Sequence, residues 1–196
     1  MLEYAFDSTK EVEKRIQAMN NLLVLARERS GAEFLWSMGA VPMLLKVIEN
    51  AEPLSSRADE EERKDFILAA QRVLDELAKN EERALKLMET IGHDKAVYLI
   101  NSNNQKFSDA ASIFVQRILN ALSGMNISEG KKPDTDACER NKVAIVRVLF
   151  ELKRMLTDPN VTALARNNVI DLLLKNLMHM DGGLPRGWSW RFMEDE

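Results

Sequence analysis

The sequence predicts an all-α protein built from stacked helical repeats, and three observations support this. The chain has only eight glycines and five prolines among 196 residues, an apolar pattern of helical period returns in four segments, and two glycines recur at the same place in that pattern. Leu, Ala, Glu, Lys and Arg lose little rotamer freedom in a helix, so their abundance favours helix over strand. An apolar content of 45% is enough for a continuous core.

The repeated pattern places apolar residues at the i, i+3 and i+4 spacing of one buried helical face. Each copy contains an anchoring leucine, and these leucines are spaced by roughly 45 to 52 residues, near or slightly above the roughly 40 to 47 of common helical repeats. The four copies are Ile16, Ala18, Leu22, Leu25 and Ala26; Leu68, Ala70, Leu74, Leu77 and Ala78; Ile113, Val115, Leu119 and Leu122; and Ala165, Val169 and Leu172.

Gly39 and Gly92 mark corners between a short helix and the helix that follows it. The short helices are expected over residues 32–38 and 81–91, and the repeated apolar segment forms a long third helix in each unit. Short helix, glycine, second helix and long third helix is the order of the armadillo repeat. HEAT repeats have two helices and usually lack a glycine corner, so we rank them second.

We therefore expect one armadillo-type α-solenoid domain over residues 1–196, a right-handed superhelix of about three repeats that is truncated at both ends. The third repeat is degenerate, because residues 125–137 contain Gly130 and Pro133 and indicate a loop where a short first helix is expected. The expected units are 8–29 as the third helix of a preceding repeat, repeats over 30–80, 81–124 and 125–181, and 188–196 as the start of a further repeat.

Both ends of the sequence predict an excised piece of a longer protein, since natural solenoid ends usually carry polar-faced caps. We interpret Trp188, Trp190 and Phe192 as the interior of a helix whose partners lie beyond the chain, in preference to a protein-binding anchor. Apolar faces at truncated ends could also allow self-association.

Charge and hydropathy argue against nucleic-acid and membrane partners. The formal charge is −4, and no basic stripe is interleaved with aromatic residues. No apolar run approaches the roughly 20 residues that span a bilayer, and the N-terminus lacks the basic region of a signal peptide. We therefore expect a cytoplasmic location.

Cys138 stands alone, so no intrachain disulfide is possible, and we interpret it as an ordinary thiol.

The sequence predicts no catalytic, metal or cofactor site, and therefore no enzyme. His93 and His179 lie far apart, and each is interpreted as a surface or capping residue rather than a ligand. The acidic run 59–62 precedes an apolar-periodic helix, where carboxylates complement the positive end of the helix dipole. The glycines of 181–183 lack the preceding strand of a phosphate-binding loop.

Eight positions on the third helices are the predicted lining of a concave, protein-binding face. Armadillo proteins that bind extended peptides carry an asparagine one position before the anchoring leucine and a tryptophan four residues earlier. This chain has neither ladder, which argues against an import receptor for basic peptides, and its mixed charges suit a polar patch on a folded partner better. The eight positions are Asn20, Val24, Arg72, Glu76, Arg117, Ala121, Asn167 and Asp171.

Several stretches together resemble one family. They are Ala-Met-Asn-Asn-Leu-Leu-Val-Leu-Ala-Arg-Glu at 18–28, the Gly39 corner, Lys-Lys-Pro-Asp at 131–134 before Cys138, and Gly-Trp-Ser-Trp-Arg-Phe at 187–192. Over essentially its whole length, the chain is similar to the central armadillo region of the animal myosin chaperones of the UCS (Unc-45/Cro1/She4) family.

In that family an N-terminal tetratricopeptide domain binds Hsp70 and Hsp90 tails, and a C-terminal UCS domain grips the myosin motor. The resemblance implies that both domains lie outside this chain and that no functional residue of the family carries over. The leading hypothesis is a non-catalytic connector that positions the Hsp90/Hsp70-binding module relative to the myosin-binding module and assists myosin folding and assembly. The alternative is a stand-alone armadillo adaptor that binds a protein partner on its concave face.

Overall fold

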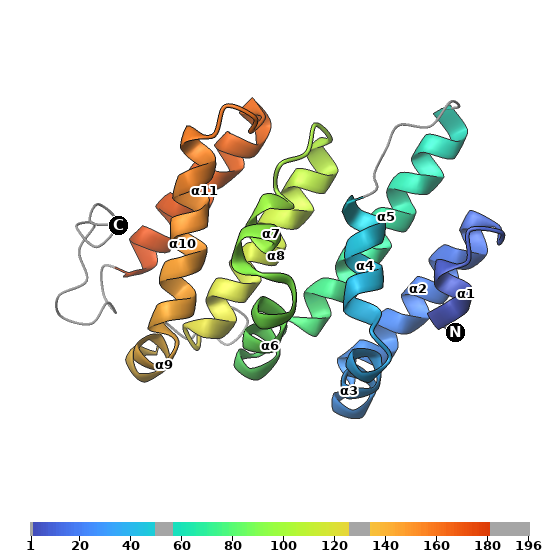
Figure 1. The fold of residues 1–196 in the computed structure, drawn as a ribbon, viewed down its shortest axis with the longest axis horizontal. Helices are drawn as coiled ribbons and strands as arrows, with labels where there is room; N and C mark the ends of the chain where they lie inside the picture. The colour runs from blue at the N-terminus through green and yellow to red at the C-terminus, as the bar shows by residue number, and fades with distance from the viewer. Residues whose placement is uncertain (1, 50–56, 126–133, 181–196) are drawn as a thin grey trace. The chain divides into compact units, whose positions relative to one another are not determined.

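All regular structure among the described residues is α-helical, which confirms the predicted fold class. The computed structural model describes residues 2–49, 57–125 and 134–180. The helices are α1 Leu2–Phe6, α2 Val12–Arg27, α3 Arg29–Ser37, α4 Ala40–Glu49, α5 Arg57–Leu77, α6 Glu81–Ile91, α7 His93–Tyr98, α8 Gln105–Leu122, α9 Thr135–Arg140, α10 Lys142–Thr157 and α11 Ala163–Met180 (Figure 1).

The chain forms two compact units, Met1–Leu77 and Ala78–Glu196. In the first unit the long helices α2 and α5 pack along each other, and α4 packs on α5. The core between them includes fully buried Met19, Leu22, Leu44 and Leu74. The polar faces of both long helices are left to solvent, so each helix is amphipathic as its sequence predicts.

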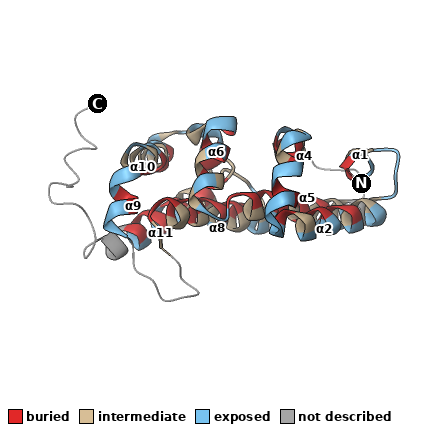
Figure 2. Ribbon diagram, turned by 90° about the horizontal axis from the view of Figure 1, so that it is seen from below, coloured by how far each residue is buried: buried red, intermediate tan, exposed pale blue. Residues whose placement is uncertain are grey.

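The second unit contains α6 to α11, with the long helices α8 and α11 packed side by side. Helix α6 packs on α8, and α10 packs on α7, α8 and α11. In Figure 2 the buried residues of α8 and α11 lie toward α6 and α10, so one core joins the two layers of this unit. Its fully buried side chains include Leu87, Ile100, Phe114 and Ile118.

Both predicted glycine corners are present. Gly39 has a φ of 69° between α3 and α4, and Gly92 has a φ of 85° between α6 and α7. This left-handed backbone is favourable for glycine because it lacks a Cβ atom. At Gly39 the axes of the flanking helices differ by 75°. At each corner the chain therefore changes direction between the short first helix and the second helix of its unit.

The anchoring leucines of the repeated pattern are largely internal. Leu77 and Leu122 are fully buried and Leu172 is 4% exposed, whereas Leu25 is half-buried. One expectation from the pattern is wrong: Ile113, counted with the core face, is 60% exposed. The buried face of α8 instead runs through its neighbour Phe114, because successive helical residues point about 100° apart.

Two short helices were not expected from the sequence. Helix α1 precedes the first predicted helix. Helix α9 occupies Thr135–Arg140, so the end of the predicted loop 125–137 is helical. It begins where the side chain of Asp134 accepts a hydrogen bond from the Asp136 backbone N–H, at 3.0 Å. This cap satisfies one of the N–H groups at the helix start that have no intrahelical partner.

Some predictions fall outside the described residues. They concern residues 126–133 of the expected loop, the glycines of 181–183, the further repeat at 188–196 and the aromatic side chains Trp188, Trp190 and Phe192. Among the described helices, none is by itself long and apolar enough to cross a bilayer. Only α3 and α4 taken together have the length and apolar composition of a membrane span, and the axes of these two helices differ by 75°.

Candidate protein-binding groove

The predicted binding positions are divided between the two units. Helices α2 and α5 carry Asn20, Val24, Arg72 and Glu76 in the first unit, and α8 and α11 carry Arg117, Ala121, Asn167 and Asp171 in the second. Glu76, Arg117 and Ala121 are half-buried and the other five are exposed. Their role in binding stays a prediction.

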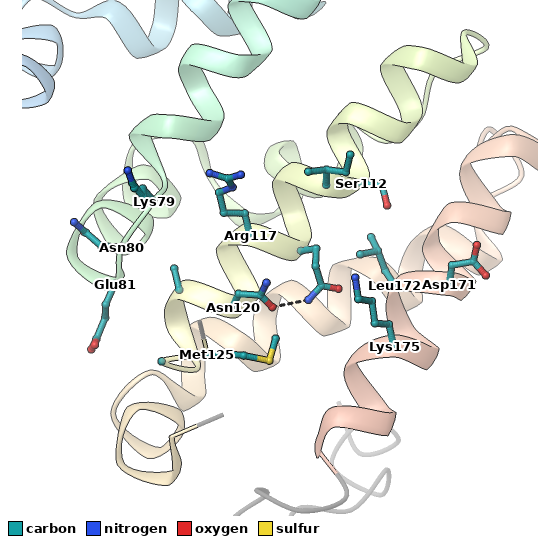
Figure 3. A pocket seen from close by; sticks show the side chains of 14 residues that line it. Lys79, Asn80, Glu81, Ser112, Arg117, Asn120, Met125, Asp171, Leu172 and Lys175 are labelled. Atoms are coloured by element: carbon teal, nitrogen blue, oxygen red, sulfur yellow. Dashed lines mark hydrogen bonds between the residues drawn. The ribbon is translucent and has the colours of Figure 1, made fainter. Parts of the chain in front are cut away.

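The second unit contains a groove that brings three of these eight residues together. Arg117, Ala121 and Asp171 line it, whereas Asn167 does not. Its volume is about 890 Å³, within the roughly 300 to 1,000 Å³ of common ligand sites. Figure 3 shows side chains reaching it from α8, from α11 and from the turn before α6.

The sequence prediction missed most of the groove's lining. The additional residues are Lys79, Asn80, Glu81, Ser112, Ile113, Gln116, Asn120, Gly124, Met125, Leu172 and Lys175. Several of them lie one or four positions from a predicted residue on the same helix, such as Gln116 beside Arg117 and Lys175 one turn after Asp171. The helical period i, i+4 applied to the predicted positions would have identified Lys175.

A buried pair of amides joins α8 to α11 beside the groove. Gln116 Nε2 donates to Asn176 Oδ1 at 3.1 Å, and Asn176 Nδ2 donates back to Gln116 Oε1 at 3.0 Å. Gln116 Nε2 also donates to Asn120 Oδ1 at 2.8 Å, and Asn176 Nδ2 donates to the Leu172 carbonyl at 2.7 Å. Both amides are thereby paired inside the protein, which fixes the register of the two helices.

A polar cluster surrounds Glu81, one of the residues that line the groove. Arg140 on α9 forms an ion pair with Glu81 at 3.2 Å, and Asn141 Nδ2 donates to the same carboxylate at 3.0 Å. Hydrogen bonds from Arg140 and then Asn141 lower the pKa of Glu81. Asn141 also donates to the Leu122 carbonyl at 2.8 Å, so this side chain caps the end of α8 as well.

Further polar contacts hold the opposite ends of the same helices. Asn168 Nδ2 on α11 donates to Ser108 Oγ on α8 at 2.8 Å, and Ser108 Oγ donates to the Ile100 carbonyl at 2.8 Å. The backbone N–H of Thr162 donates to Asn101 Oδ1 at 3.0 Å. The two long helices of this unit are therefore tied to each other at Ser108 with Asn168 and at Gln116 with Asn176, and the segments that precede them are tied at Asn101 with Thr162.

Titratable groups elsewhere in the described residues do not assemble into a site. No group of three or more His, Cys, Asp or Glu residues that could hold a metal ion occurs in the described ranges. Cys138 is buried, and burial raises the pKa of its thiol, which keeps it protonated. His93 follows the Gly92 corner and is half-buried, and burial lowers its pKa, with nearby Arg147 acting in the same direction.

Comparison with known proteins identifies one group of relatives. No family model matches the chain. Protein unc-45 homolog B from Homo sapiens is 28% identical over 182 residues, which is 92% of this chain and 18% of that protein. The Danio rerio protein of the same name is 28% identical over 90% of this chain and 18% of its own length. The chain thus spans about a fifth of the length of the curated relatives it matches.

Solved structures give the same result. The crystal structure of the myosin chaperone UNC-45 from C. elegans matches with a TM-score of 0.76 and 42% identity, over 95% of this chain and 21% of that chain. UNC-45 from Drosophila melanogaster matches with a TM-score of 0.78 and 25% identity, over 91% of this chain and 22% of that chain. These matches confirm the resemblance to a UCS-family armadillo region and the armadillo-like solenoid fold.

Proposed function

We propose that this chain is a non-catalytic connector segment of a myosin-directed co-chaperone. In this role it positions an Hsp90/Hsp70-binding module relative to a myosin-binding module in the cytoplasm, and so assists myosin folding and assembly. The observation that carries the proposal is the 42% identity to a myosin chaperone over 95% of this chain but only 21% of that chain. The remainder of that relative's chain is long enough to contain the modules that a connector would join.

The polar contacts of the second unit support a connector of fixed geometry. Its long helices are joined by the buried Gln116–Asn176 pair and by Asn168 with Ser108, and the segments before them by the Thr162 backbone with Asn101. Buried, fully paired polar groups favour one register over alternatives, because a shifted register would leave them unsatisfied. A segment with one register can transmit an angle and a distance between its neighbours.

A chimera tests the connector role. The matching segment of C. elegans UNC-45 is replaced either by this chain or by a Gly/Ser linker of equal length, which behaves as a flexible coil. Suppression of heat-induced aggregation of a myosin motor domain is then measured by light scattering. We expect the chimera with this chain to retain protection, the linker chimera to lose most of it, and the isolated chain to give none.

Two results would contradict the connector role. One is equal protection by the linker chimera, which would show that the geometry of the segment is unimportant. The other is micromolar binding of an Hsp90 C-terminal peptide to the isolated chain, which would make the segment a chaperone-binding module itself. A pull-down of the myosin motor domain with the isolated chain, beside the intact chimera, separates a spacer from a client binder.

A second candidate is a stand-alone adaptor that binds a protein partner through its third helices. The observation that favours it is the groove in which Arg117, Ala121 and Asp171 meet. Reversing the charges of Arg72 and Arg117 to glutamate is expected to abolish binding to a native partner in this case, while circular dichroism shows an unchanged helix content. Unchanged binding would remove this candidate.

A further inference from the structure

Helix α7 is the shortest second helix in the described residues. It has six residues, whereas α4 has ten and α10 has sixteen. No side chain among the described residues caps its first N–H groups, and its buried residues are Ala96 and Val97, both small. A helix that is held by so little buried apolar area belongs to the elements that open at a low free energy.

His93 is the first residue of α7, which packs on α10, α6 and α8 (Figure 1). The residue as a whole is half-buried, but its Nε2 atom is buried and has no hydrogen-bond partner among the described residues. A charged N–H in this place would lose its hydration without gaining an acceptor, which costs more free energy than for a neutral nitrogen. The closed position of His93 therefore suits the neutral imidazole.

The charges around His93 do not compensate for this burial. Burial lowers its pKa most, and Arg147 on α10 acts in the same direction. Asp94 and Glu151 act in the opposite direction, but Asp94 is exposed and Glu151 forms an ion pair with Arg154 at 3.0 Å. Among the described residues, no charged side chain of α6 or α8 adds to this set. Protonation is therefore easier for the imidazole when it has left α10.

We propose that α7 is a pH-sensitive latch, in which neutral His93 holds the start of α7 against α10 and protonated His93 frees it. The imidazolium gains hydration by leaving α10 and moves away from Arg147. The long helices stay together, because the buried amides of Gln116 and Asn176 join α8 to α11 without α7. The latch does not depend on the connector role of the chain.

The test is amide hydrogen exchange of the whole chain, followed by NMR at pH 7.5 and pH 5.5. The reporting amides are those of Ala96 and Leu99, which donate to the carbonyls of Gly92 and Lys95 at 3.2 Å. After correction for the intrinsic exchange rate, we expect their protection to fall about three- to tenfold at pH 5.5. The upper limit follows because an exposed imidazole with a pKa near 6.5 is about tenfold more protonated than neutral at that pH.

The same spectra contain the reference and the first variant. The protection of amides in the middle of α8 should change by less than about twofold, because α8 stays packed on α11. His93→Gln should remove most of the acid-dependent loss in α7, since glutamine does not titrate. Equal losses in α7 of the unchanged chain and of His93→Gln would overturn the proposal, and so would equal losses in α7 and α8, which indicate unfolding of the whole unit.

A charge variant separates the latch from a merely structural role of His93. Arg147→Gln should raise the pKa of His93, read from the chemical shifts of its ring, and reduce the loss of protection in α7 at pH 5.5. Lys95→Gln is the matched control, because Lys95 is an exposed cation on α7 whose charge does not shift the pKa of His93. Equal effects of the two variants would refute the mechanism.

The latch and the connector role fail independently. At pH 7.5 His93 is neutral, so the UNC-45 chimera carrying His93→Gln should protect the myosin motor as well as the chimera with the unchanged chain. Loss of the acid response in α7 with intact protection by the chimera would therefore overturn the latch alone.

Discussion

Gln116 and Asn176 show how single side chains set the register of this protein at the residue scale. Each amide satisfies the other inside the core, at 3.0 and 3.1 Å. A buried amide without a partner costs about 1 to 3 kcal/mol, whereas replacing both partners by apolar groups can be nearly neutral. The pair is therefore more important for specifying the helix register than for adding stability.

Asn176→Ala is expected to lower the free energy of unfolding by about 2 kcal/mol, because it removes the donor to the buried Gln116 Oε1, while Gln116 Nε2 keeps its bond to Asn120. Urea denaturation followed by circular dichroism measures this. Asn167→Ala, an exposed asparagine on the same helix, serves as control and should change stability by less than about 0.5 kcal/mol. The double variant Gln116→Leu with Asn176→Leu should be more stable than Asn176→Ala. A double variant that is less stable would contradict the interpretation.

Two glycines of the first unit should respond differently to alanine. A Cβ at Gly31 would lie 2.1 Å from the Leu25 carbonyl oxygen, whereas a Cβ at Gly39 meets nothing within 4 Å. Gly31→Ala must displace backbone and should cost about 3 kcal/mol. Gly39→Ala carries only the cost of a positive φ, about 1 to 2 kcal/mol, and Gly39→Asn should cost less. Thermal unfolding of the three variants measures this order of stability, and a larger loss of stability in Gly39→Ala than in Gly31→Ala would refute it.

His93 should make stability depend on pH. Burial, followed by the Arg147 charge, lowers its pKa in the folded chain, while the unfolded imidazole titrates near 6.5. Between these values only the unfolded chain binds the proton. The contribution of His93 to the free energy of unfolding is therefore fully present above about pH 6.5, and it is lost as the pH falls through the pKa of His93 in the folded chain.

The measurement compares the free energy of unfolding at pH 7.5 and pH 5.5. The loss on acidification should be smaller in His93→Gln than in the unchanged chain, and His179→Gln provides the control for removing a histidine. Equal losses in the unchanged chain and in His93→Gln would show that His93 does not contribute.

At the element scale, side-chain caps fix the starts of α6, α8 and α9, whereas α2, α3, α7 and α10 begin without one. Asn80 accepts from the Arg83 N–H at the start of α6, and Asn104 accepts from the Lys106 N–H at the start of α8. The predicted short helix 81–91 agrees with α6. Helix α9 was missed because its cap, Asp134, lies beside the glycine- and proline-containing stretch that predicts a loop.

Removing the cap of α8 should destabilise the second unit. Asn104→Ala is expected to cost about 1 kcal/mol, and Asn104→Asp should retain most of the stability, because a carboxylate also accepts from the first N–H groups. Asn103→Ala is the neighbouring control, since Asn103 is exposed and is not the cap. Urea denaturation of the three variants checks this. Equal losses for Asn103→Ala and Asn104→Ala would contradict the capping role.

At the scale of the whole molecule, the division into Met1–Leu77 and Ala78–Glu196 should appear in local stability. Repeats of a solenoid interact mainly with their neighbours, so a local loss of stability spreads only a limited distance. In Asn176→Ala, amide hydrogen exchange should therefore accelerate more in α8, α10 and α11 than in α2 and α5. Gly31→Ala should show the reverse. Uniform acceleration in both variants would indicate that the chain unfolds as one cooperative unit.

The sequence by itself determined the helical class, the repeated apolar face, the corners at Gly39 and Gly92 and the resemblance to the UCS family. These features depend on local periodicity and on backbone preferences that each segment carries alone. The groove was decided only by tertiary structure. Arg117 and Ala121 on α8 meet Asp171 and Lys175 on α11 because two helices distant in the chain pack side by side, and periodicity along one helix carries no information about which faces of two helices adjoin.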